Sequence, residues 1–303
     1  MSFRDRLLER ARRAQRRVVL PEGDDPRVQA AALRINTLGT GVAEILGPPS
    51  EDPRLPQCVA HLRQRRPDRF ASEAAARTAL DHPLTFGACL VGIGVADAMV
   101  GGADYPTSDT IRAAIWAVGT APGIASVSGT FYMVREEQTL SFTDCAVVPQ
   151  PTPEQLAQSA VAAAIDRRRI VGDEPIVAFL SYSTKGSATG PMVDHVRAGV
   201  DRFRRLAPEV RCDGELQGDA ALAPDVAERK APHSAVAGRA NVLVFPDLDS
   251  GNIAYKLVQR LGGWEAVGPI LQGLARPIAD LSRGATVDDI VDTAAVAVLQ
   301  VKE

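Results

Sequence analysis

The sequence predicts an α/β protein built from two doubly wound α/β/α domains. Short β-branched segments alternate with helical segments along the chain, and this alternation is typical of parallel strands connected by helices. The length of 303 residues favours two hydrophobic cores over one. With 46% hydrophobic and 23% charged residues, the composition is that of a globular protein.

The first elements form a β-strand, a helix and a second β-strand. The strand Val18–Leu20 precedes a helix from Pro26 to Leu38, with Asp25 as its N-cap and Gly39–Gly41 after its end. The next strand is predicted at Val42–Leu46. Such a βαβ unit implies a parallel sheet with right-handed crossovers. Before it, Met1–Arg17 carries two acidic residues among its arginines, so we expect a surface helix and not a transit peptide.

The alternation continues in two series. The remaining elements of the first series are an apolar segment at Ala98–Gly102, helices at Pro83–Gly92 and Asp109–Val118, and a strand at Ile124–Val127. The second series has strands at Cys145–Val148, Ile176–Ser181 and Val242–Phe245, and helices at Glu154–Arg167, Pro191–Leu206 and Ile253–Leu261. The polar segment Arg135–Gln138 lies between the two series and is predicted from composition to lie near a domain boundary.

Composition and motifs exclude several classes of protein. The net charge of −3 does not favour nucleic-acid binding, and the apolar segments are too short to span a membrane. The four cysteines are far apart, which favours a reducing cytosol over a disulfide framework or zinc site. The four histidines are isolated, so no metal site is predicted.

Two segments have residues suited to binding anions. In Thr107–Arg112, the hydroxyls of Ser108 and Thr110 and the guanidinium of Arg112 could hold a phosphate at a helix N-terminus. The residues alone slightly favour the alternative that Ser108 is a helix cap and Arg112 a solvated helix residue. In Leu281–Asp289, Ser282 and Arg283 precede a Thr-x-x-Asp pattern. Asp289 could therefore act as a base or complete a capping box.

Long segments of the chain, in order, resemble the phosphate acetyltransferase family (phosphotransacetylases, within the phosphate acetyl/butyryltransferases). The segments that carry the resemblance are VLPEG with Asp25 and Arg27, ADAMVGGA at 96–103, SDTIR at 108–112, LSYSTKGS at 180–187, DGELQ at 213–217, PHSAVAGRAN at 232–241, FPDLDSGNIAYK at 245–256, GPILQGL at 268–274 and DLSRG at 280–284.

The resemblance implies an isocitrate/isopropylmalate dehydrogenase-like fold with an interdomain cleft. The first domain would comprise residues 1–123 with 270–303, and the second residues 124–269. It also implies reversible acetyl transfer in a ternary complex, from acetyl-CoA and phosphate to CoA and acetyl phosphate. CoA would be a substrate, and no tightly bound cofactor is expected. A cytoplasmic homodimer is the implied state.

The resemblance also implies the roles of individual residues. Ser282, Arg283 and Asp289 match the family's catalytic serine, arginine and aspartate, and Arg112 matches an arginine that binds anionic substrates. Arg63 is the best match to a second CoA-site arginine, with Arg65 and Arg66 as alternatives. Asn252, Tyr255 and Lys256 are further candidates for substrate binding, although Tyr255 and Lys256 could simply pack.

The sequence departs from the family in one loop. Gly101 and Tyr105-Pro106 replace the more usual serine and histidine-serine, which leaves the acyl preference open. Phosphate butyryl- or propionyltransferase activity is therefore an alternative. A second alternative is a catalytically silent acyl-CoA-binding regulatory module, but retention of Ser282, Arg283 and Asp289 favours an enzyme.

Overall fold

The computed structural model describes residues 2–302, which form two compact units. The discontinuous unit comprises Arg4–Pro122 and the chain from Leu274 onward. The central unit comprises Gly123–Gly273 together with the start of the chain up to Phe3. Each unit contains its own sheet, so the predicted α/β fold class is confirmed.

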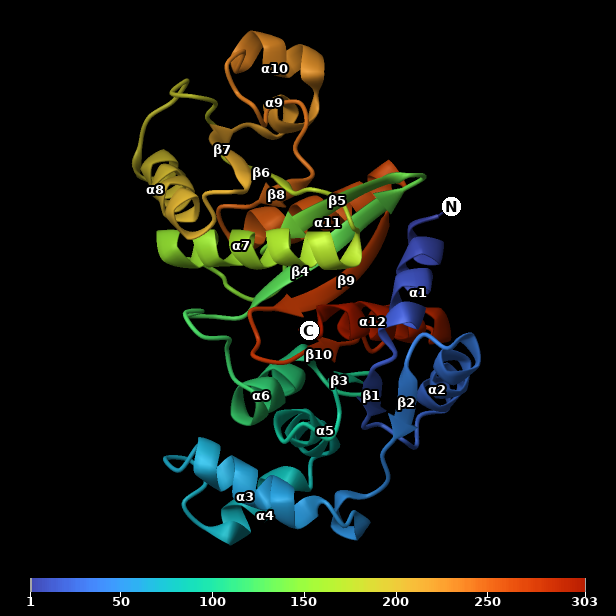
Figure 1. Ribbon diagram of the computed structural model, residues 1–303. Coiled ribbons are helices and arrows are strands. Elements are labelled where there is room, and N and C mark those ends of the chain that lie inside the picture. Colours follow the sequence, from blue (N-terminus) through green and yellow to red (C-terminus); the bar gives the residue numbers. More distant parts are fainter. Residues whose placement is uncertain (1, 303) are drawn as a thin grey trace. The chain divides into compact units, whose positions relative to one another are not determined.

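The discontinuous unit is built on a four-stranded parallel sheet with the order β10-β3-β1-β2 (Figure 1). Its strands are β1 (Arg17–Leu20), β2 (Val42–Ile45), β3 (Ala98–Gly101) and β10 (Ile278–Asp280). The order confirms the parallel βαβ unit predicted from the N-terminal segment. It also places β10, which is formed near the end of the chain, beside β3.

Helices cover both faces of this sheet. The helices are α1 (Phe3–Ala14), α2 (Pro26–Leu38), η1 (Pro49–Glu51), α3 (Leu55–Arg65), α4 (Glu73–Leu80), α5 (Pro83–Gly92), α6 (Thr107–Ala117) and α12 (Val287–Gln300). Helices α3 to α6 form one core around Val19 and Met99. Helices α2 and α12 lie together against the sheet (Figure 1). As predicted, Asp25 caps α2, with its side chain accepting a hydrogen bond from the Arg27 N–H.

The central unit has a six-stranded mixed sheet with the order β7-β6-β8-β5-β4-β9. The strands from β7 to β5 run parallel, whereas β4 is antiparallel to both β5 and β9. Its elements are β4 (Ser128–Arg135), β5 (Gln138–Thr143), α7 (Pro153–Ile170), β6 (Ile176–Leu180), α8 (Pro191–Leu206), β7 (Arg211–Leu216), α9 (Gly218–Leu222), α10 (Pro224–Lys230), β8 (Val242–Val244), α11 (Leu248–Gly262) and β9 (Glu265–Gln272).

Alternate residues of the central strands point into two separate cores. Val177 and Phe179 of β6 pack with α7 and α8, whereas Ala178 and Leu180 of the same strand pack in a second core that includes residues of α10 and α11. Because side chains of a strand alternate between faces, a strand that is apolar on both faces requires helices on both. The parallel part of this sheet is therefore doubly wound.

The segment predicted to lie near a domain boundary is the turn of a hairpin. Arg135 pairs with Gln138 across β4 and β5, and Glu136 has a positive φ of 56°. The compositional prediction for Arg135–Gln138 is therefore wrong. Tight turns with positive φ are usually signalled by Gly, Asn or Asp, and this turn has two glutamates instead.

Two predicted strands are loops, because side chains bind their backbone N–H groups. In Cys145–Val148, the N–H groups of Ala146, Val147 and Val148 all donate to the carboxylate of Asp144. In Ile124–Val127, the N–H of Ala125 donates to the Gln158 side chain. Strand β5 ends at Thr143, two residues before the first of these segments, and β4 begins at Ser128, directly after the second. No helix within residues 2–302 is both long enough and apolar enough to cross a membrane.

Candidate active site

The carboxyl ends of β1, β3 and β10 meet at one edge of the sheet in the discontinuous unit. From β1 the chain passes to β2 on one side and later to β3 on the other. The crevice at such a change of direction is where α/β sheets commonly bind ligands. Here the strands are followed by Glu22, by Gly102–Asp104 and by the turn Ser282–Ala285.

A buried glutamate shapes the loop after β3. The carboxylate of Glu22 accepts hydrogen bonds from the N–H groups of Gly102 (2.8 Å), Ala103 (3.1 Å) and Asp104 (2.8 Å). At Gly102, φ is 105° and a Cβ atom would lie 2.7 Å from the Oδ1 atom of Asp280. At Gly101, a Cβ atom would lie 2.6 Å from Leu84. Steric contacts therefore explain why glycine occupies both positions.

Asp280 is the last residue of β10 and joins two parts of the site. Its Oδ2 atom accepts a hydrogen bond of 2.6 Å from the hydroxyl of Thr107, the first residue of α6. Its residue exposure is 2%, and this burial raises its pKa to about 6, although the hydroxyls of Thr107 and Thr110 oppose the increase. The sequence indicated no role for Asp280 beyond its place in the DLSRG segment.

The Ser282–Ala285 turn follows Asp280 directly. The Ala285 N–H donates to the Ser282 carbonyl (2.8 Å), and the Gly284 N–H donates to the Ser282 hydroxyl (3.3 Å). Ser282 and Arg283 are both exposed. The chain then enters α12, which means that the two residues predicted to be catalytic lie together in one short turn at the edge of the sheet.

Asp289 lies in the first turn of α12 and completes a capping box with Thr286. Its Oδ2 atom accepts hydrogen bonds of 2.8 Å from both the N–H and the hydroxyl of Thr286, and its own N–H donates to that hydroxyl (3.2 Å). Asp289 therefore has the capping role that was predicted as the alternative to a role as a base. Its carboxylate is exposed, so a role in binding or proton transfer is also open to it.

Helix α6 carries the anion-binding residues predicted at 107–112. The helix begins at Thr107 with Pro106 as its N-cap, so the alternative that Ser108 is the cap is wrong. Ser108 is exposed, whereas Thr110 is fully buried and its hydroxyl faces Asp280. The Arg112 guanidinium is exposed and lies 2.9 Å from the Asp109 carboxylate.

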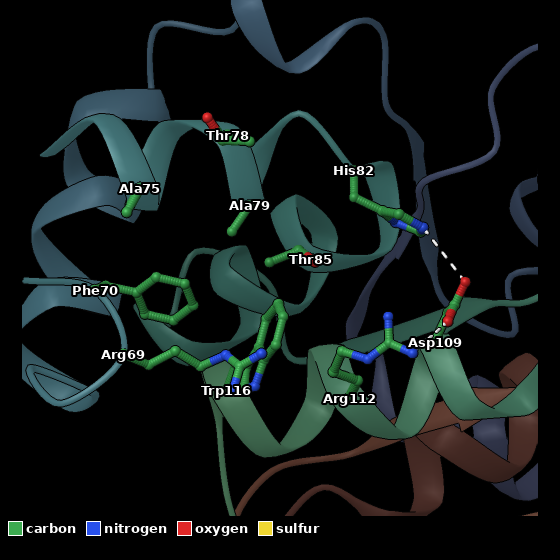
Figure 2. A pocket seen from close by; sticks show the side chains of 10 residues that line it. All are labelled: Arg69, Phe70, Ala75, Thr78, Ala79, His82, Thr85, Asp109, Arg112 and Trp116. Atoms are coloured by element: carbon green, nitrogen blue, oxygen red, sulfur yellow. Dashed lines mark ion pairs between the residues drawn. The ribbon is translucent and has the colours of Figure 1, made fainter. Parts of the chain in front are cut away.

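A pocket of about 530 Å³ lies beside Arg112. Figure 2 shows Arg112 and Trp116 projecting side by side from α6, with Arg69 and Phe70 across from them and His82 near Asp109. The Arg69 guanidinium lies 4.6 Å from the centre of the Trp116 ring, and Phe70 packs edge-on against that ring. The pocket is lined by Arg69, Phe70, Ala75, Thr78, Ala79, His82, Thr85, Asp109, Arg112 and Trp116.

The arginine beside Arg112 in this pocket is Arg69, not one of the three predicted candidates. Arg63 is exposed on α3 and does not line the pocket. Arg65 lies close to Gly119, and Arg66 pairs with Asp68 at 3.2 Å. Arg69 follows α3 in a loop that turns back toward α6, a path that spacing in the sequence does not reveal.

The three candidates from the central unit differ in their contacts. The Asn252 side chain donates to the Cys145 carbonyl (3.1 Å), and the Tyr255 ring stacks on Phe131 with 3.9 Å between ring centres. Both residues therefore have packing roles in α11. Lys256 is exposed, with its ammonium group 5.0 Å from the Tyr255 ring centre.

Within residues 2–302, no group of three or more His, Cys, Asp or Glu side chains is placed to hold a metal ion. The groups at the edge of the sheet include guanidinium groups, hydroxyls, backbone N–H groups and carboxylates. Such a set suits the binding of phosphorylated substrates and the stabilisation of negative charge.

Comparison with known proteins places this chain among close relatives. The family model described as phosphate acetyl/butaryl transferase matches residues 2–298. A phosphate acetyltransferase of Paracoccus denitrificans is 42% identical, with the match covering 98% of this chain and 99% of the relative. A phosphate acetyltransferase of Escherichia coli is 41% identical, but the match covers only 45% of that longer protein. The structure of a phosphotransacetylase from Streptococcus pyogenes matches with a TM-score of 0.94, at 40% identity and with 99% and 98% of the two chains covered.

Proposed function

Since the chain belongs to the phosphate acetyl/butaryl transferase family, we propose that it transfers an acetyl group reversibly between CoA and inorganic phosphate. The products in one direction are acetyl phosphate and CoA. One observation supports this most directly: the hydrogen bond between Asp280 and Thr107 connects the Ser282–Ala285 turn to the helix that carries Arg112. A catalytic turn and an anion-binding helix thus share one edge of the sheet.

Arg283 and Ser282 stabilise the charge that develops during acyl transfer. When a thiolate attacks acetyl phosphate, negative charge develops on the carbonyl oxygen and then on the leaving phosphate. The exposed Arg283 guanidinium neutralises that charge, and the Ser282 hydroxyl donates a hydrogen bond to it. The exposed Ser108 hydroxyl, in the first turn of α6, helps to hold the phosphate. The buried Thr110 hydroxyl lies beside Asp280 and opposes the increase in the pKa of that carboxyl.

Asp289 takes the proton of the CoA thiol in the direction of acetyl-CoA formation. An unperturbed thiol has a pKa of about 8.5, so only a few per cent is thiolate near neutral pH. Both hydrogen bonds from Thr286 go to the Oδ2 atom of Asp289, so its Oδ1 atom is the one that accepts the proton. Asp289→Asn tests this role: the substitution keeps the size of the side chain but should lower kcat and change its pH dependence.

The pocket beside α6 binds CoA, which acts as a substrate and not as a tightly held cofactor. Its two guanidinium groups suit the phosphates of CoA, and Phe70 and Trp116 offer aromatic surface to the adenine ring. Arg69 therefore replaces Arg63 as the proposed partner of Arg112. Lys256 remains the candidate for substrate binding in the central unit, supported there by Asn252 and Tyr255.

A thiol-release assay tests the proposed activity. Acetyl-CoA should release CoA only when phosphate is added, and the rate should fall as the acyl chain lengthens from acetyl through propionyl to butyryl. A maximum at butyryl would assign the butyryl branch of the family. Thiol release that is independent of phosphate, or none with any acyl-CoA, would contradict phosphate-dependent acyl transfer.

Substitutions separate the catalytic turn from the pocket. Arg283→Gln removes a donor aimed at developing charge, so kcat should fall by about 10²–10³-fold. Arg69→Gln should mainly raise KM for CoA, by roughly tenfold if one charge-assisted contact worth about 1.5 kcal/mol is lost. Arg63→Gln is the matched control from the same region, and its KM should not change. A rise in KM for Arg63→Gln alone would restore the original assignment.

We also propose a homodimer in a reducing cytosol. Ile253, Leu257 and Leu261 follow one another at helical spacing on α11 and are 56%, 51% and 83% exposed, so they offer an apolar stripe to a second copy. All four cysteines are free, which suits a reducing compartment. Light scattering should give twice the mass of the chain, and Leu257→Asp should reduce it to the monomer.

A further inference from the structure

The discontinuous unit contains the tripeptide Asp-Pro-Arg twice, and both copies form the same local structure. In Asp25–Arg27, the aspartate accepts hydrogen bonds from the N–H, Nε and Nη2 groups of the arginine at 2.7, 3.1 and 2.6 Å. In Asp52–Arg54, the corresponding distances are 2.8, 2.8 and 2.6 Å. Proline fixes the middle residue in both, so each arginine is held in the same way by its own aspartate.

The two arginines differ in what the rest of the guanidinium group binds. The Nη1 atom of Arg27 donates to the carbonyls of Arg283 (2.8 Å) and Ala285 (3.2 Å). Its Nη2 atom donates to the carbonyl of Ala103 (3.1 Å) in the loop after β3. Arg54 instead uses Nη2 to bind the Glu44 carboxylate (2.7 Å), on β2 at the other edge of the sheet.

All five N–H groups of the Arg27 side chain have acceptors in this arrangement. Asp25 takes the Nε donor and one Nη2 donor, and backbone carbonyls take the other three. The Asp25 side chain is only 4% exposed, and its hydrogen bonds with Arg27 lower the pKa of its carboxyl. The aspartate therefore stays charged and holds the guanidinium plane in place.

The Ser282–Ala285 turn has few other anchors. Its own hydrogen bonds are local, between Ser282 and the two residues that follow Arg283. Before the turn, the Leu281 N–H is bonded to the Gly101 carbonyl (2.9 Å). Within the turn, the described hydrogen bonds from distant residues come from Arg27, which binds the carbonyls on both sides of Gly284.

We propose that Arg27 is a positioning residue for acetyl transfer: it fixes the backbone of the Ser282–Ala285 turn and thereby the direction of the Ser282 and Arg283 side chains. This inference rests on the proposed function. Arg27 does not contact substrate, because its donors are directed at backbone carbonyls and at the carboxylates of Asp25 and Asp104. A shift of about 1 Å in catalytic groups can reduce turnover by about 10²-fold, so a loosened turn should affect kcat more than substrate affinity.

The test compares Arg27→Lys with Arg54→Lys in the full-length protein. Lysine keeps the charge but cannot form the planar fork that binds two carbonyls and a carboxylate at once. We expect Arg27→Lys to lower kcat by about 10–100-fold with less than about a threefold change in KM for CoA. Arg54→Lys should lose a similar amount of thermal stability and keep its kcat within about twofold, because it repeats the local structure without the link to the turn.

Several outcomes would overturn the proposal. If both variants keep wild-type kcat, or both lose it in proportion to the unfolded fraction, Arg27 has only a structural role. If Arg27→Lys does not fold, Asp25→Asn/Arg27→Gln removes the charge of both partners and gives the same comparison against Asp52→Asn/Arg54→Gln. Wild-type protein without phosphate-dependent thiol release would instead contradict the proposed function, whatever the variants do.

Methylguanidinium provides a further readout. Added to Arg27→Ala, it should occupy the space of the missing guanidinium and restore part of kcat without changing KM for CoA. No such recovery is expected for Arg283→Gln, in which glutamine fills the site. A change in KM on addition of methylguanidinium, with no gain in kcat, would place the effect of Arg27 in substrate binding and contradict a role in positioning.

Discussion

Asp280 and Glu215 are equally buried carboxyl groups whose pKa values shift in opposite directions. Each residue is 2% exposed, and each lies at or next to the carboxyl end of a strand, Asp280 in the discontinuous unit and Glu215 in the central unit. Burial would raise the pKa of both. In Asp280 it does so, to about 6, whereas the pKa of Glu215 is lowered to about 2.

The difference comes from the partners. Arg197 binds both oxygens of Glu215, at 2.8 and 3.0 Å, and the Gly186 N–H and Ser183 hydroxyl donate to the same carboxylate. Asp280 accepts a hydrogen bond from the Thr107 hydroxyl but has no arginine partner among residues 2–302, and the nearby charge of Glu22 raises its pKa further. A carboxylate whose charge is neutralised by an arginine stabilises a loop, whereas a buried carboxyl group without such a partner, here next to the proposed catalytic turn, is typical of functional sites.

Of the substitutions that test this comparison, Asp280→Asn should have the largest effect on the pH dependence of stability. The carboxyl pKa rises from 3.8 to about 6 on folding, which corresponds to about 3 kcal/mol. The wild-type group contributes its full stability below pH 3.8, and this contribution is lost as the pH rises through 6. In urea titrations between pH of about 4 and about 7.5, wild type should therefore lose about 2–3 kcal/mol more than Asp280→Asn. Parallel curves would mean that Asp280 is not the titrating group.

Glu215→Gln should change the pH dependence of stability in the opposite direction and by a smaller amount. The pKa of Glu215 falls from 4.5 to about 2 on folding, so its contribution is present above pH 4.5 and is lost as the pH falls toward 2. Because Arg197 is 39% exposed, we expect about 2 kcal/mol at neutral pH. Wild type should thus lose stability in acid faster than Glu215→Gln. A variant that loses stability in parallel with wild type below pH of about 4 would contradict this assignment.

Removing one hydroxyl donor that binds each carboxyl group should have the smallest effects. Thr107→Val removes the hydroxyl donor 2.6 Å from Asp280, costs about 1 kcal/mol and raises the pKa of Asp280 further. Ser183→Ala removes a donor 3.0 Å from Glu215 and also the acceptor of the Ala188 N–H (3.0 Å), but Glu215 keeps Arg197 and Gly186. The pKa of Glu215 should therefore change less than the pKa of Asp280. Titration of the two carboxyl groups by NMR measures both pKa values, and a larger change for Glu215 would show that compensation does not decide the outcome.

Sequence reasoning predicted the elements whose backbone hydrogen bonds are regular. The helix Pro83–Gly92 and the helix Pro191–Leu206 have the predicted bounds, and the parallel β1–β2 unit is confirmed. It was wrong where a side chain replaced a neighbouring strand as the hydrogen-bond partner. Asp144 binds the N–H groups that a strand at Cys145–Val148 would have offered to the sheet. Apolar composition cannot distinguish these two partners.

The site was predictable only in part, for a similar reason. Ser282, Arg283, Asp289 and Arg112 were found because their segments resemble a family, and they remain proposals as catalytic and binding residues. Arg69 was missed because a loop brings it to the pocket. The contact between Arg27 and the turn was missed because its acceptors are backbone carbonyls, which any residue has, so no side-chain pattern records it.

The discontinuous unit has a consequence for synthesis on the ribosome. The strand β10 and the Ser282–Ala285 turn are translated after the whole central unit, although they join β3, which is made much earlier. Domains commonly begin to fold while translation proceeds. Until residues 278–285 emerge, the edge of β3 lacks its partner strand and the guanidinium of Arg27 lacks its acceptors in the turn. The proposed site of a nascent chain can therefore be completed only after residues 278–285 have been synthesised.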